Sequence, residues 1–80
     1  MVKPSKIEVE TALVEARRMR EAGEDDFFLA RTLLNHHHRL HLLEEVYRAA
    51  AGYMHGESAQ QHALLVRALD AYRRYDEAPG

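Results

Sequence analysis

The sequence predicts an all-α fold in which a long central helix is flanked by two shorter helices. Apolar residues recur at alternating spacings of four and three along three segments, which is the period of an amphipathic helix. A serine followed three positions later by Glu or Gln marks two of the three starts, and a glycine ends the first segment. No segment has the alternating apolar and polar residues of a strand. We expect one domain, residues 1–80, with the three helices antiparallel because the connections between them are short.

The first helix is predicted over about residues 5–22. Ser5 and Glu8 have the spacing of a capping box, in which each side chain accepts a free backbone N–H at the helix start. Gly23 supplies the left-handed residue that commonly follows a helix C-terminus. The residues on its apolar face are Val9, Leu13, Ala16 and Arg20, with Ala12 and Met19 beside them.

The central helix is predicted over about residues 26–54. Asp25 or Asp26 can cap its start, where a carboxylate meets the positive end of the helix dipole. Gly52 weakens the segment, because glycine inside a helix costs about 1 kcal/mol relative to alanine. The apolar stripe of this helix consists of Leu29, Leu33, His36, Leu40, Leu43, Tyr47, Ala50 and Met54.

The third helix is predicted over about residues 59–77. Ser58 and Gln61 repeat the capping-box spacing at its start. Its apolar stripe consists of Leu65, Ala68, Tyr72 and Tyr75, flanked by Leu64 and Leu69.

The predicted helices differ in length, and this difference predicts self-association. At 1.5 Å per residue the central helix is about 43 Å long and each neighbour about 27 Å. Each end of the central helix therefore has a single companion within the chain, which leaves apolar side chains uncovered. We expect a homodimer, with four or six helices in its core, to cover them. The expected partner-binding residues are Phe27, Phe28, Val46 and Tyr53.

The composition limits the classes of function. The 80 residues include no cysteine, which excludes disulfides and thiolate metal sites and favours a cytoplasmic protein. No apolar run approaches the roughly 18 residues of a membrane-spanning helix, so we expect no membrane segment. The formal net charge of −2 is far from the basic balance that phosphate binding requires, so nucleic acid is an unfavourable partner. The side chains that a nucleic-acid site would use are Arg17, Arg18 and Arg73.

Histidines are concentrated in the central helix, where four of the six lie between residues 36 and 41. His36 falls on the apolar stripe, opposite Leu13 when the first two helices are aligned. Buried polar groups normally have hydrogen-bond partners. We therefore expect His36 to be buried and bonded to a tyrosine or to Asp76 of the third helix.

His37, His41 and Glu45 are spaced four residues apart, which places them on one side of a helix. Such imidazole pairs bind zinc or another transition metal weakly, and a zinc site needs three or four ligands. The alternative function is therefore a transition-metal site completed at a dimer interface. The simpler interpretation is a solvated or interface flank, because helical spacing generates such pairs wherever histidine is frequent. A third interpretation is that one histidine is phosphorylated, but nothing in the sequence indicates which one.

The sequence offers no catalytic constellation. Ser5 and Ser58 are explained as helix caps, and no glycine-rich phosphate loop or H-E-x-x-H motif occurs. We therefore predict that the protein is not an enzyme. The predicted function is that of a small intracellular interaction or accessory protein, acting through self-association or recognition of a partner helix.

Overall fold

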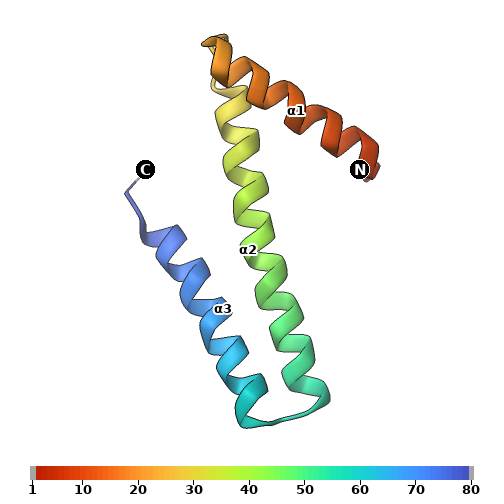
Figure 1. The fold of residues 1–80 in the computed structure, drawn as a ribbon, viewed down its shortest axis with the longest axis vertical. Coiled ribbons are helices and arrows are strands. Elements are labelled where there is room, and N and C mark those ends of the chain that lie inside the picture. The colour runs from red at the N-terminus through yellow and green to blue at the C-terminus, as the bar shows by residue number, and fades with distance from the viewer. Residues whose placement is uncertain (1, 80) are drawn as a thin grey trace. The chain divides into compact units, whose positions relative to one another are not determined.

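A computed structural model of the protein describes residues 2–79, which form three α-helices (Figure 1). Helix α1 spans Lys6–Ala22, α2 spans Leu29–His55 and α3 spans Ala59–Glu77. No strand occurs within residues 2–79, which confirms the all-α prediction for this part of the chain. The chain divides into two compact units, the first ending at His37 and the second beginning at His38, so α2 contributes to both.

Helix α1 begins and ends as its capping residues predict. The Ser5 N–H donates to Glu8 Oε1 at 2.8 Å, and the Glu8 N–H donates to Ser5 Oγ at 3.1 Å, which completes the capping box. Gly23 has a φ of 70°. Its N–H and that of Glu24 donate back to the carbonyls of the last turn, at 3.2 and 2.9 Å, in the pattern of a Schellman motif.

Helix α2 begins at Leu29, three residues later than predicted, because Phe28 has a left-handed backbone with a φ of 59°. A helix cannot continue through this conformation. The carboxylate of Asp25 accepts the backbone N–H groups of Ala30 and Arg31 at 2.8 and 2.9 Å. The prediction of an aspartate cap is thus confirmed, whereas the predicted start near residue 26 is wrong.

Helix α3 has its predicted bounds, and Ser58 Oγ accepts the Gln61 N–H at 3.1 Å. The side chain of Gln61 packs against Gly52 in the last turns of α2. A Cβ added to Gly52 would lie 2.7 Å from Gln61 Oε1. The glycine therefore leaves room for the end of the Gln61 side chain.

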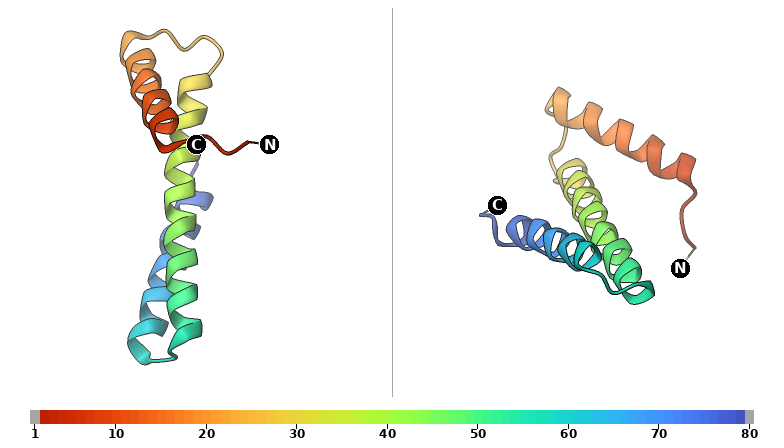
Figure 2. Two further views of the ribbon diagram at one scale, coloured as in Figure 1. Left: turned by 90° about the vertical axis from the view of Figure 1, so that its right-hand side faces the viewer. Right: turned by 60° about the horizontal axis from the view of Figure 1, so that its bottom comes forward.

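Within the second unit, α3 lies beside the second half of α2 (Figures 1 and 2). The rings of Tyr53 and His62 are 6.1 Å apart, near the connection of the two helices. At the far end of α3, the rings of Tyr75 and His38 are 4.9 Å apart. Residues late in α2 thus meet residues early in α3.

The predicted stripe of α3 is confirmed as a half-buried face: Leu65, Ala68, Tyr72 and Tyr75.

The prediction of a buried His36 is wrong, because this residue is exposed. The side chains expected to bond to His36 contact Arg39 instead. The Arg39 guanidinium donates to the Tyr72 hydroxyl at 2.7 Å and lies 3.5 Å from the Asp76 carboxylate. The physical reason is that α2 carries two apolar faces. The large half-buried side chains beside α3 are those of Leu42, Val46 and Tyr53, which form a series with Ala49. Of the predicted stripe in this part of α2, Ala50 is half-buried, whereas Leu40, Leu43, Tyr47 and Met54 are exposed.

Candidate functional site

Exposed apolar side chains form a line along α2 in the second unit. Leu40, Leu43, Tyr47 and Met54, hereafter the α2 stripe, have exposed fractions of 54%, 40%, 75% and 79%. Leu29 and Leu33 continue the same spacing in the part of α2 that belongs to the first unit, and they are exposed too. An apolar helix face of this kind is normally covered in a folded protein.

The α2 stripe faces away from α3. Leu42, which is half-buried beside α3, and Tyr47 are five residues apart, which places their side chains about 140° apart around the helix axis. Helix α3 can cover only one of these two directions. The other apolar face of α2 therefore has no cover from α3.

The second unit contains no fully buried residue between His38 and Pro79. The three buried hydrophobic residues of the described chain, Leu13, Ala16 and Ala30, all belong to the first unit. A hairpin of two helices gives each helix only one neighbour, so neither is enclosed. This unit thus has one apolar contact between its helices and one apolar face left for another molecule.

A second exposed apolar feature lies in the connection between α1 and α2. Phe27 is 83% exposed and Phe28 is 54% exposed. The guanidinium carbon of Arg31 lies 4.7 Å from the centre of the Phe28 ring, a cation–π contact. The backbone hydrogen bonds that Asp25 accepts, first from Ala30 and then from Arg31, lower the pKa of its carboxyl group. We call residues 25–28 the aromatic loop.

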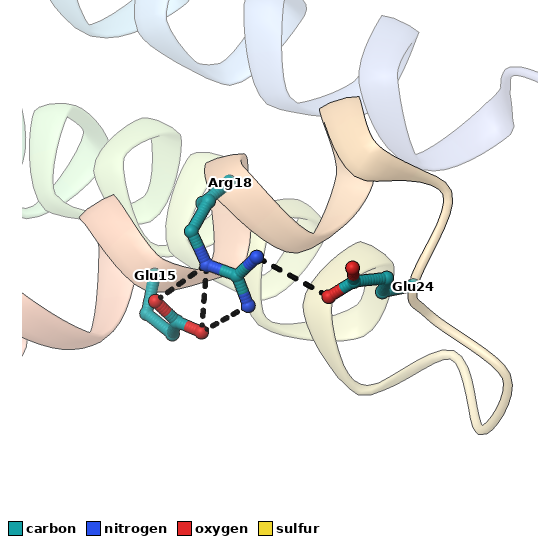
Figure 3. A network of polar contacts seen from close by, with 3 residues as sticks. All are labelled: Glu15, Arg18 and Glu24. Atoms are coloured by element: carbon teal, nitrogen blue, oxygen red, sulfur yellow. Dashed lines mark hydrogen bonds and ion pairs between the residues drawn. The ribbon is translucent and has the colours of Figure 1, made fainter.

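Arg18 ties the start of this connection to α1 (Figure 3). Its guanidinium donates to the carboxylate of Glu15 at 2.6 Å and to that of Glu24 at 3.2 Å. All three side chains are exposed, so the pairs add little stability. They do hold Glu24, which directly precedes the aromatic loop, against α1.

The predicted partner-binding residues occupy two environments. Phe27 and Phe28 lie in the aromatic loop, whereas Val46 and Tyr53 are half-buried beside α3. The α2 stripe was predicted as core and is exposed. A signal for this was available, because Leu42, Val46, Ala49 and Tyr53 form a second series with spacings of four and three, one residue away from the stripe.

The predicted metal ligands do not form a site within the chain. His37 and His41 are exposed, while Glu45 is half-buried and accepts a hydrogen bond from Arg48. Across residues 2–79, no group of three or more His, Cys, Asp or Glu side chains is arranged to hold a metal ion. A transition-metal site completed by a second chain remains a prediction.

Comparisons of the chain with protein-family models, with curated proteins and with solved structures gave no match. None of the helices in residues 2–79 combines the length and apolar character that crossing a membrane requires.

Proposed function

We propose that the protein is a small non-catalytic interaction protein that acts by self-association, with the α2 stripe of one copy packed on that of a second copy. The observation that carries the proposal is the exposure of four large apolar side chains on the face of α2 that points away from α3. In a symmetric pair the same surface patch serves both copies. Two α2–α3 hairpins joined in this way form a four-helix core.

Charge supports this choice of surface. The four stripe positions carry no ionisable side chain other than the Tyr47 phenol, whereas Arg39 and Glu44 lie beside the stripe. Charged groups at the rim of an apolar contact stay solvated, so they do not oppose burial. The arrangement resembles a coiled-coil seam, in which apolar core positions are flanked by charged residues.

A glutamate in the stripe tests the proposal. Leu43→Glu places a charge in the proposed contact at a position that is 40% exposed in the single chain, so the helices still form. Val14→Glu is the matched control, because Val14 is 64% exposed on α1, outside the stripe. Each protein also carries Phe27→Ser, so that the exposed ring of the aromatic loop makes no contact of its own. Light scattering after size-exclusion chromatography should then show a dimer for the parent and the control, and a monomer for Leu43→Glu. A monomeric parent, or a Leu43→Glu variant that dimerises like the parent, would contradict the proposal.

A further inference from the structure

The aromatic loop has the features of a docking element. A left-handed backbone is unfavourable for a residue as bulky as Phe28, and such strain is characteristic of ligand clamps and switches. Two backbone hydrogen bonds to Asp25 and the stacked guanidinium of Arg31 hold this conformation. Within this loop Phe27 is 83% exposed, and its neighbour Asp26 is exposed as well.

The second unit contains a groove that suits such an element. It lies between α2 and α3 and has a volume of about 460 Å³, within the range of roughly 300–1,000 Å³ for sites that bind small molecules. Alanines at positions 49, 68 and 71 leave room for a ring, and Leu42 and Leu64 give the groove apolar walls. We call this feature the α2–α3 groove.

The groove and the α2 stripe are separate surfaces. Glu45 lines the groove, and Tyr47 is the centre of the stripe. The two residues are two positions apart on one helix, and their side chains therefore point in nearly opposite directions, about 160° apart. A molecule in the groove leaves the stripe free.

The charges at the groove favour an acidic partner. Arg48 and Arg67 both line it, and Glu45 is the one acidic residue of the lining. Glu45 accepts a hydrogen bond from Arg48. Arg67 is exposed and forms no ion pair with any other residue in the described part of the chain. The groove thus combines an apolar interior with an unpaired guanidinium.

From these two features we infer that Phe27 of one copy inserts into the α2–α3 groove of a second copy, where the Asp26 carboxylate pairs with Arg67. The loop supplies an exposed ring beside an exposed carboxylate, and the groove supplies an apolar cavity beside an unpaired cation. Every copy carries one loop and one groove, so the contact joins two different surfaces. This contact does not depend on the α2 stripe.

The absence of tryptophan from the chain allows a direct test. A Phe27→Trp variant carries the only tryptophan at the tip of the loop, and its emission reports whether the side chain is solvated. The Leu43→Glu substitution is added to every protein in the experiment, so that the stripe contact is removed. The labelled protein is held at about 1 μM while a Phe27→Ser protein, which has a groove but no competing ring, is added up to several hundred micromolar.

The inference predicts a saturable shift of the emission to shorter wavelength as the Phe27→Ser protein is added. Introducing Arg67→Glu into the added protein should weaken the apparent affinity about tenfold, because it replaces an attraction to the Asp26 carboxylate by repulsion between two carboxylates. Arg74→Glu is the matched control, because it makes the same charge change at an exposed position of α3 outside the groove, and it should leave the affinity within about twofold.

Two results would overturn the inference. One is an emission spectrum that does not change at any concentration of the added protein. The other is a shift that is the same with Arg67→Glu as with Arg74→Glu, which would place the loop on a different surface. Both results leave the stripe proposal untouched, since that proposal is judged on the oligomeric state of proteins that carry Phe27→Ser and therefore lack the loop contact.

Discussion

Replacing Tyr47 by serine should weaken self-association strongly while leaving the isolated chain folded. Tyr47 is 75% exposed, so its ring contributes little to packing within the chain. An aromatic side chain has a surface of about 200 Å², of which roughly 150 Å² is therefore free in the single chain. If about 100 Å² of apolar ring surface is covered on association, the gain at about 25 cal/mol per Å² is about 2.5 kcal/mol per copy.

In a symmetric dimer the residue counts twice, so Tyr47→Ser removes up to about 5 kcal/mol, which raises the dissociation constant by between roughly three and four decades. Sedimentation equilibrium at several loading concentrations measures this constant directly. Val14→Ser is the control, because it removes a side chain that is 64% exposed on α1. Circular dichroism of both variants at low concentration should match the parent. A Tyr47→Ser dissociation constant within about threefold of that of Val14→Ser would refute the reasoning.

Three further predictions concern the caps, the glycines and the histidines. Gly23→Ala should destabilise the protein by about 1–2 kcal/mol, since it places a Cβ on a left-handed residue. Gly52→Ala should stabilise it by up to about 1 kcal/mol, because the side chain of Gln61 can move away from the added methyl group. Urea unfolding monitored by circular dichroism measures the change in the free energy of unfolding for both variants. The pKa of Asp25 is lowered by its backbone hydrogen bonds, so its contribution to stability is complete above the unfolded value of about 3.9 and is lost as the pH falls through the folded value. Thermal unfolding should accordingly give the parent a higher midpoint temperature than Asp25→Ala at pH 6, and this difference should shrink as the pH falls below the unfolded value of about 3.9. If a transition metal binds, zinc titration by calorimetry should show uptake that His41→Ala abolishes, and equal binding by that variant would exclude the predicted ligand set.

The capping residues made the ends of the helices predictable from the sequence. Ser5 with Glu8, and Ser58 with Gln61, are local signals, since each acts through hydrogen bonds within one turn, and both mark the starts that the structure has. Gly23 is also a local signal, because it ends α1 through hydrogen bonds to the last turn of that helix. The start of α2 was missed because the left-handed conformation of Phe28 has no signature in the residue type: phenylalanine is among the residues least expected there.

The faces of α2 were harder to assign than its ends. This helix has apolar residues in two overlapping series, one containing Leu43 and Tyr47, the other Leu42 and Val46. Periodicity shows that both are helical but does not say which one α3 contacts. That choice depends on the fit of side chains between helices distant in sequence. The misplacement of His36 followed from the same ambiguity, because it was assigned to the series that the structure leaves exposed.

The most direct test of the account is the mass of the unmodified assembly, measured by native mass spectrometry of untagged protein at about ten micromolar. Packing of one α2 stripe on another predicts a main species at twice the chain mass of 9.2 kDa. If the main species is 9.2 kDa at about ten micromolar and is still 9.2 kDa when the measurement is repeated at about one hundred micromolar, the claim that a second copy covers the exposed face of α2 is contradicted.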